Sequence, residues 1–110
     1  MTKAKDLARL GQITQLLLDT KLADLRALAA KRQHSLDLLG NLNRPAVQTD
    51  LPIVAAHLAE VRYQSWADIR RAEINVILAR QTAEMYVARD AARCAFGRNQ
   101  AFQALKDTLR

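Results

Sequence analysis

The side chains best able to do chemistry in this sequence are two histidines with acidic neighbours. His34 and Asp37 are three residues apart, as are His57 and Glu60, and residues at that spacing share one face of a helix. Metal-binding helices carry the opposite order, Glu-x-x-His. The seams described below place His34 on the outer side of its helix and His57 beside a seam, so the two rings should not converge. We therefore expect no metal site and interpret both histidines as solvated residues.

The single cysteine does not have the surroundings of a nucleophile. Cys94 has no histidine near it in the sequence to act as a base. It shares a helix face with Val87 and Ala101, which predicts a packed cysteine that behaves as a small hydrophobic residue. The three glycines stand alone, without the spacing of a phosphate-binding loop. We expect no catalytic residue, no cofactor and no small-molecule substrate.

The composition predicts an all-helical chain of one domain. The 110 residues include 3 Gly and 2 Pro, too few for a sheet with many turns, and Ala, Leu and Arg, which are strong helix formers, dominate. One cysteine cannot form an internal disulfide. No uncharged apolar stretch approaches the roughly 20 residues of a membrane span, and no apolar signal segment follows the basic start. These features predict a cytoplasmic protein.

Two long helices are predicted, over about 3–39 and about 51–109, with a connection over about 40–50. Two consecutive amphipathic helices joined by a short connection pack against each other in opposite directions. The predicted fold is therefore a single all-α domain in which two long helices form an antiparallel coiled-coil hairpin.

The break between the helices is predicted from four residues. Gly40 suits the left-handed conformation that closes many helices. Pro45 prevents the first helix from continuing, because its ring clashes with the preceding turn. Asp50 can cap the second helix, with Pro52 in its first turn.

Each predicted helix carries a seam of residues at heptad spacing. In the first helix the seam is Leu18, Leu22, Leu25, Ala29, Arg32, Leu36 and Leu39. In the second helix it is Ile53, Ala56, Tyr63, Ala67, Ile74, Ile77, Ala88, Ala91, Ala95, Phe102, Leu105 and Leu109. Further apolar residues, among them Ile69, Val76 and Val87, lie on another side of the second helix. One neighbouring helix cannot cover both sides, so this pattern predicts a second copy or a host protein.

The position of the break also predicts how the helices are aligned. If the chain folds back near Pro45, Met1 lies opposite Asp90. The last ~20 residues, from about Ala91, then project ~30 Å beyond the first helix. We expect this projection to require a binding partner.

The charge balance favours an anionic partner without specifying one. There are 17 Lys and Arg against 11 Asp and Glu, a formal net charge of +6, which suits nucleic acid, anionic lipid or an acidic protein. Five arginines recur every nine residues, which is two and a half helical turns, so successive arginines point to opposite sides and form two lines rather than one basic face. They are Arg62, Arg71, Arg80, Arg89 and Arg98. Acidic residues interleave with them, as on a solvated helix, and we do not expect nucleic acid to be the partner.

An aromatic pair marks the early part of the second predicted helix. Tyr63 and Trp66 are one turn apart. A tryptophan on a helix with no thick core to enter is often an interface anchor. The alternative is core packing of Trp66 against Lys21, Asp24 and Leu25 of the first helix.

Two runs of the second predicted helix combine aromatic, basic and apolar residues. They are RYQSWADI over 62–69, followed by Ile74, Ile77 and Leu78, and AFGRNQAFQAL over 95–105. With the leucine-rich start at Leu7, Leu10 and Leu17, these runs resemble the flagellar export protein FliJ and its type III secretion counterparts. Those proteins in turn resemble the coiled-coil stalk of the ATP synthase gamma subunit.

The resemblance implies a non-catalytic stalk peripheral to the inner-membrane export apparatus. Its paired termini would enter a hexameric export ATPase, its middle would contact the membrane export gate protein, and export chaperones would be further partners. The ATPase-binding residues that it implies are Leu7, Leu10, Phe96, Arg98, Phe102 and Leu105. The gate-binding residues that it implies are Trp66, Ile69, Arg70, Glu73 and Ile77.

Two other interpretations stay open from the sequence. One is a basic helical hairpin that binds nucleic acid, and its affinity would fall steeply with salt. The other is a structural bundle in which copies of the hairpin cover each other's second apolar face. Sedimentation at micromolar concentration distinguishes the bundle from a stalk that is monomeric until it binds its partners.

Overall fold

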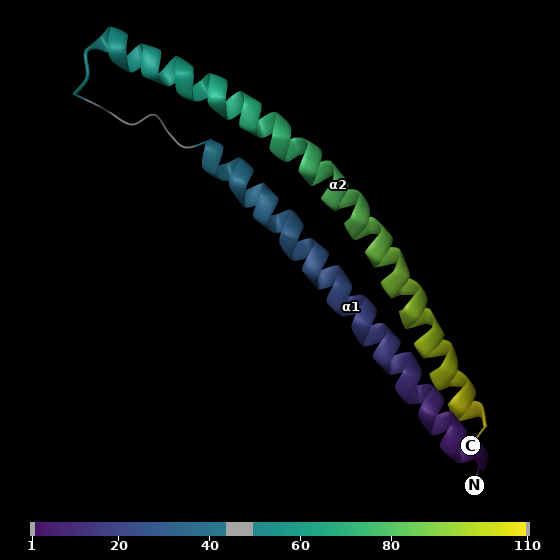
Figure 1. Cartoon of the computed structure of the whole chain (residues 1–110). Coiled ribbons are helices and arrows are strands. Elements are labelled where there is room, and N and C mark those ends of the chain that lie inside the picture. Colours follow the sequence, from purple (N-terminus) through teal and green to yellow (C-terminus); the bar gives the residue numbers. More distant parts are fainter. Residues whose placement is uncertain (1, 44–49, 110) are drawn as a thin grey trace. The chain divides into compact units, whose positions relative to one another are not determined.

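The chain folds into two long helices (Figure 1). The computed structural model describes residues 2–43 and 50–109. Within them α1 spans Thr2–Leu42 and α2 spans Ile53–Thr108, and these two ranges contain no strand. Wherever the helices contact each other they run in opposite directions, which confirms the predicted all-α fold class, an antiparallel coiled-coil hairpin.

Both ends of the connection differ from the prediction. Gly40 lies inside α1 and does not adopt a left-handed conformation, and the helix closes with a turn in which the Asn43 N–H donates to the Gly40 carbonyl at 3.1 Å. Pro52 stands before α2 rather than in its first turn, because its carbonyl accepts the first helical hydrogen bond, from Ala56 at 2.8 Å. The predicted fold point, Pro45, lies outside the described residues.

The chain divides into two compact units, each built from a part of both helices. Unit 1 comprises Met1–Ala30 and Ala83–Arg110, and unit 2 comprises Lys31–Thr82. Each unit has its own seam between the two helices, and its own polar contacts within that seam.

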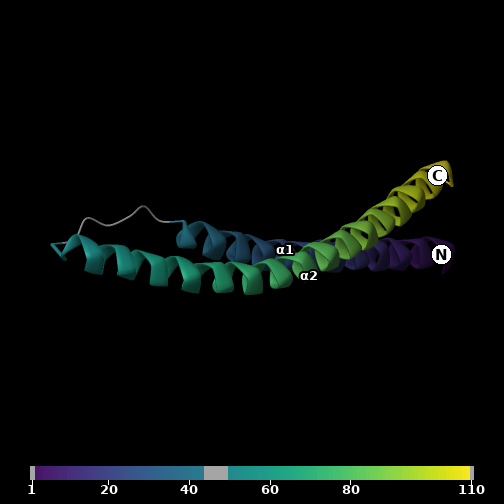
Figure 2. The same cartoon turned by 90° about the horizontal axis from the view of Figure 1, so that it is seen from above.

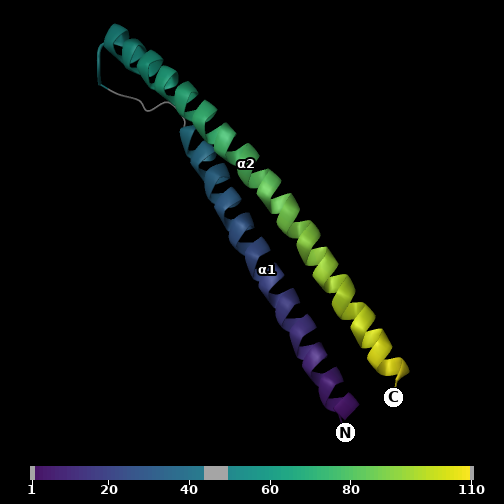
Figure 3. The ribbon, with the colours of Figure 1, turned by 45° about the vertical axis from the view of Figure 1, so that its right-hand side comes forward.

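The seam of unit 1 brings the start of α1 beside the end of α2. The Thr14 hydroxyl donates to Asn99 Oδ1 at 3.1 Å, and the Phe102 ring packs over Gly11. Gly11 comes three residues before Thr14 in α1, and Phe102 comes three residues after Asn99 in α2, as an antiparallel pair requires. The described ends of the two helices lie at the same end of this unit in all three views (Figure 1, Figure 2 and Figure 3). Its buried residues are Leu18, Ala92, Ala95, Asn99 and Phe102.

This register corrects the predicted projection at the end of the chain. Phe102 is only 9% exposed because it covers Gly11, and Leu109 lines a cavity together with Leu7 and Leu10. The residues from Ala91 onward are therefore paired with α1 instead of extending beyond it. Ala95 and Phe102 are covered by α1 itself, whereas Phe96, Leu105 and Leu109 stay exposed.

The extra length of α2 lies at its other end, in unit 2. The carbonyl of Leu42, the last residue of α1, accepts a hydrogen bond from the Tyr63 hydroxyl at 3.2 Å. α2 begins at Ile53, so it has about ten residues, or ~15 Å, before Tyr63. Ile53 and Val54 at this start are 89% and 80% exposed.

The core of unit 2 is small and partly polar. Leu42, Ala67 and Ile74 are buried in contact with one another, and Leu38, Leu39 and Tyr63 pack around them. Toward the far end of the unit the seam changes to polar pairs. The Ser35 hydroxyl donates to Gln81 Oε1 at 2.6 Å, and Arg32 Nε donates to the Thr82 hydroxyl at 3.0 Å.

A heptad seam consists of two rows of residues along each helix. One row of each observed seam agrees with the prediction, and the other row is shifted by one residue. In α1 the predicted Leu18, Leu25, Arg32 and Leu39 do face α2, but Ser35 is buried where Leu36 was expected. Leu28 is half-buried whereas the predicted Ala29 is exposed, and the buried Leu42 extends the seam beyond its predicted end at Leu39. In α2 the predicted Ala67, Ile74, Ala88, Ala95 and Phe102 face α1. Ala92 and Asn99 are buried beside them, whereas the predicted Ile77 and Leu105 are exposed.

Candidate functional site

The structure does not gather the histidines and the cysteine into one site. His34 and His57 are both exposed. Cys94 is exposed too, so the prediction of a packed cysteine is wrong: one neighbouring helix leaves the side of α2 that carries Cys94 open to solvent. Within residues 2–43 and 50–109, no three His, Cys, Asp or Glu side chains are grouped so that they could hold a metal ion.

The residues predicted to bind an ATPase lie in four different places in unit 1. Leu7 and Leu10 line an open cavity of about 610 Å³ at the end of the unit. Phe102 is buried in the seam, which removes it from any surface that a partner could contact. Arg98 and Leu105 are exposed on α2. Phe96, also on α2, lines a groove farther along the unit.

One member of the cavity at the helix ends was not predicted from the sequence. Leu109 was expected to lie in the seam, but it is 61% exposed and lines this cavity with Lys3, Ala4 and Asp6. Its position could have been found only from the register, because Leu109 comes close to Leu7 when Phe102 covers Gly11. The cavity is therefore a product of how the two helices are aligned.

The residues predicted to contact an export gate lie in unit 2 on two sides of α2. Trp66 and Arg70 line a groove of about 260 Å³ between the helices. Ile69 is two residues from the buried Ala67 and so points about 200° away from it around the helix, into solvent. Ile77 is also exposed. Glu73 is exposed and pairs with Arg70, with Nη1 and Oε2 3.1 Å apart.

Trp66 is positioned as a surface residue rather than as a core residue. It is 55% exposed, and its ring centroid lies 5.8 Å from that of Tyr63 with the planes tilted by 40°. The groove that it lines continues onto Leu38 and Leu42 of α1. The predicted alternative, core packing against Lys21, Asp24 and Leu25, is wrong: Trp66 is exposed, and the α1 residues that line its groove are Leu38, Asn41 and Leu42. An exposed tryptophan beside a half-buried tyrosine and a groove is typical of an interface anchor.

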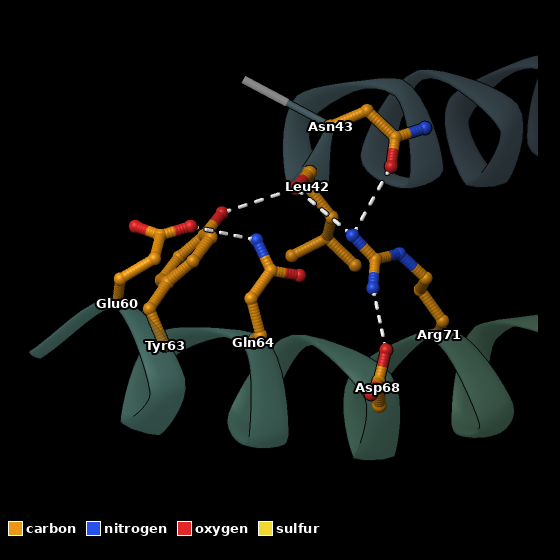
Figure 4. Close-up of polar contacts among 7 residues, drawn as sticks. All are labelled: Leu42, Asn43, Glu60, Tyr63, Gln64, Asp68 and Arg71. Carbon is orange, nitrogen blue, oxygen red and sulfur yellow. Dashed lines mark hydrogen bonds and ion pairs between the residues drawn. The ribbon is translucent and has the colours of Figure 1, made fainter. Parts of the chain in front are cut away.

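A polar cluster holds the end of α1 against α2 next to this groove (Figure 4). Arg71 Nη2 donates to the Leu42 carbonyl at 3.3 Å and to Asn43 Oδ1 at 3.1 Å, while its Nη1 contacts Asp68 Oδ1 at 2.7 Å. The Tyr63 hydroxyl donates to the same Leu42 carbonyl. The last carbonyls of a helix have no hydrogen-bond partner inside that helix. Arg71 and Tyr63 of α2 supply donors to the last carbonyl of α1 and so cap its C-terminal end.

The arginines of α2 differ along the helix in whether they form ion pairs with carboxylates. Among the described residues, the two ion pairs are Arg70–Glu73 and Arg71–Asp68, and both belong to unit 2. Arg89, in unit 1, stacks over the Tyr86 ring with its guanidinium carbon 4.8 Å from the ring centroid. The described part of unit 1 therefore presents cations that form no ion pair with a carboxylate.

No family model, curated protein or solved structure matches the chain. Neither α1 nor α2, over the residues described, has a segment long and apolar enough to cross a membrane. The features that the structure does provide are exposed leucines where the helix ends meet, and an aromatic groove beside the end of α1. Both are the kind of surface that proteins use to bind other proteins.

Proposed function

We propose that this chain is a non-catalytic coiled-coil component of a flagellar or related type III protein export apparatus. In this proposal the start of α1 and the end of α2 insert together into a hexameric export ATPase. The groove that Trp66 lines, which we call the aromatic groove, contacts the membrane export gate. The protein would then act on the cytoplasmic side of the inner membrane, where export chaperones could also bind it. The observation that supports the proposal most is that the described start of α1 and end of α2 lie at the same end of unit 1 (Figure 3). Leu10 and Leu109 are exposed at this end and line its cavity.

The exposed leucines are the proposed contacts with the ATPase. Leu10 is 49% exposed and Leu105 is 53% exposed. Fully burying a leucine contributes about 1.5–3 kcal/mol, so covering the open half of each would contribute about 1 kcal/mol. Insertion of a helix pair, rather than of one projecting helix, places contacts from both helices inside the ring.

The aromatic groove is the proposed contact with the export gate. Trp66 offers a large apolar surface without having to leave a core, and Tyr63 holds one side of its ring. Arg70 and Glu73 form an ion pair on the edge of this surface. On binding, each can replace this contact with one to a charged residue of the gate protein. Interfaces are often organised in this way, with an aromatic centre and a charged rim.

Co-purification with the export ATPase tests the proposal. The doubly substituted chain Leu10→Asp/Leu105→Asp should lose at least about 2 kcal/mol of binding, or thirty-fold in affinity. The matched control is Leu58→Asp/Val61→Asp, which adds the same charge at exposed apolar residues of unit 2 and should bind normally. Phe102→Asp is unsuitable because Phe102 is buried in the seam.

Two results would contradict the proposal. The first is ATPase binding that is unchanged when Leu10 and Leu105 carry aspartate while the helical circular dichroism signal stays normal. The second is sedimentation of the isolated chain as a stable bundle that these substitutions disrupt. That second result would instead support the structural-bundle interpretation.

A further inference from the structure

A second groove between α1 and α2, in unit 1, has an apolar floor and an open top. We call it the unit 1 groove. Its volume is about 320 Å³, and its lining residues are Leu18, Leu22, Leu25, Arg89, Ala92, Arg93 and Phe96. Leu18 and Ala92 form a buried floor, whereas Phe96 on the rim is 53% exposed. Apolar surface of this kind remains in contact with water unless another molecule covers it.

The rim of this groove is positively charged. Arg89 and Arg93 lie one helical turn apart on α2 and are both exposed. No carboxylate of the described residues forms an ion pair with either of them, because the two ion pairs found there belong to unit 2. Asp19 of α1 does not form an ion pair with these arginines either; its Oδ1 accepts a hydrogen bond from Gln15 Nε2 at 2.9 Å. The rim therefore offers two guanidinium groups that can each bind a carboxylate.

The dimensions of the groove define the shape of what can fill it. Its lining residues span 18–25 of α1 and 89–96 of α2, about 10 Å at 1.5 Å per residue. A helix lying between two antiparallel helices would contact a groove of this length over two turns, with apolar side chains at positions i, i+4 and i+7. Arg89 and Arg93, four residues apart, match carboxylates at the same separation along one edge of such a helix.

We infer that the unit 1 groove binds an amphipathic helix of an acidic partner protein, which has carboxylates alongside its apolar face. The partner is identified by charge complementarity. A second copy of this chain is a poor occupant because the chain carries a net charge of +6. Its 17 Lys and Arg outnumber its 11 Asp and Glu, so a second copy would on balance bring further positive charge to the cationic rim. This inference does not depend on the proposed export function.

A pair of designed peptides tests the inference in the full chain. Both are fluorescently labelled amphipathic helices with leucine at i, i+4 and i+7, and they differ only in carrying glutamates or lysines beside the leucines. Fluorescence anisotropy should show that the chain binds the glutamate peptide at least tenfold more tightly than the lysine peptide. Arg89→Glu/Arg93→Glu should reverse this preference, and Phe96→Ala should weaken binding of the glutamate peptide.

The control separates the groove from the overall charge of the protein. Arg62→Glu/Arg80→Glu makes the same change of charge at exposed arginines of unit 2, and it should keep the preference for the glutamate peptide. The inference is overturned if neither peptide binds saturably or if the control loses the preference as well. It is equally overturned if Arg89→Glu/Arg93→Glu leaves the preference unchanged.

Two further measurements separate the unit 1 groove from self-association and from the proposed ATPase contacts. Sedimentation of the peptide-free chain should show no self-association through the groove. Self-association that Arg89→Glu/Arg93→Glu removes would overturn the inference, because a second copy would then be the occupant. The Leu10→Asp/Leu105→Asp chain should bind the glutamate peptide normally, because neither residue lines the groove. Failure of the export proposal and failure of this inference therefore produce different results.

Discussion

Replacing Gly11 by alanine measures whether α1 and α2 are aligned as the structure has them. A Cβ atom on Gly11 would lie 3.1 Å from Cε1 of the Phe102 ring, which is closer than such contacts normally are. Gly97, also inside a helix, has no atom within 4 Å of its own added Cβ. Neither glycine has a left-handed backbone that alanine would strain. The two substitutions thus make the same chemical change in a crowded place and in an open one.

The expected effects follow from helix propensity and packing. Alanine is more favourable than glycine inside a helix by about 1 kcal/mol, so Gly97→Ala should stabilise the chain by that amount. Gly11→Ala has the same gain, but the Phe102 ring, which is 9% exposed, must move away. Overpacking of this kind costs about 1–3 kcal/mol. Gly11→Ala should therefore be between neutral and about 2 kcal/mol destabilising.

Urea denaturation, followed by the helical circular dichroism signal, measures both free energies of unfolding. In thermal unfolding the Gly97→Ala chain should melt about 4–8 °C higher, the shift expected per kcal/mol for a chain of this size. A double-mutant cycle isolates the contact: in a Phe102→Ala chain the crowding is absent, so Gly11→Ala should again stabilise by about 1 kcal/mol.

Equal stabilisation by Gly11→Ala and Gly97→Ala would refute this reasoning. It would mean that the Phe102 ring does not cover Gly11. A cycle without coupling between Gly11 and Phe102 would have the same meaning. Either result would favour a register in which α1 begins opposite the region of Asp90, and the residues after Ala91 would again need a partner to cover them.

Two other substitutions test the polar contacts. Asn99→Ala removes the α2 acceptor of the Thr14 hydroxyl, which also donates to the Gly11 carbonyl, and it removes the donor to Gln15. It should cost about 1 kcal/mol of unfolding free energy in urea, and an unchanged midpoint would show that this contact does not stabilise unit 1. Arg71→Met removes the donors to Leu42 and Asn43, so amide exchange in the last turn of α1 should quicken by roughly five- to tenfold, a loss of about 1 kcal/mol. Arg70→Met, whose ion pair lies within α2, is the control, and equal exchange in both chains would contradict a role for Arg71 at the end of α1.

The sequence was sufficient to predict the two helices and half of each seam. In α1 the row through Leu18 and Leu25 is strongly apolar, so its orientation is well determined. The neighbouring row is ambiguous, because Leu36 is the more hydrophobic candidate but Ser35 is the buried residue. Ser35 can be buried because Gln81 accepts its hydroxyl hydrogen bond. A hydrophobic pattern counts Ser35 and Gln81 as polar and does not include their pairing.

The alignment of the helices could not be predicted from the same pattern. Much of the α2 seam is alanine, and a row of similar small residues packs against leucines almost equally well at several registers. Centring the fold on Pro45 selected one of these registers. The structure has another, in which Thr14 meets Asn99 and Ser35 meets Gln81. A slip of one turn would separate Ser35 from Gln81 and Asn99 from Thr14 and Gln15. A buried polar group left without a partner costs about 1–3 kcal/mol, so the polar pairs account for the register better than the apolar residues do.

This register also determines what any partner can contact. The cavity that Leu10 and Leu109 line exists only while the end of α2 is aligned with the start of α1, because these residues come from opposite ends of the described chain. The unit 1 groove likewise needs Phe96 beside Leu22. Thr14 and Asn99 pair within the same unit as both surfaces. A change that breaks this polar contact therefore acts on binding through the alignment of the helices, whichever partner is bound.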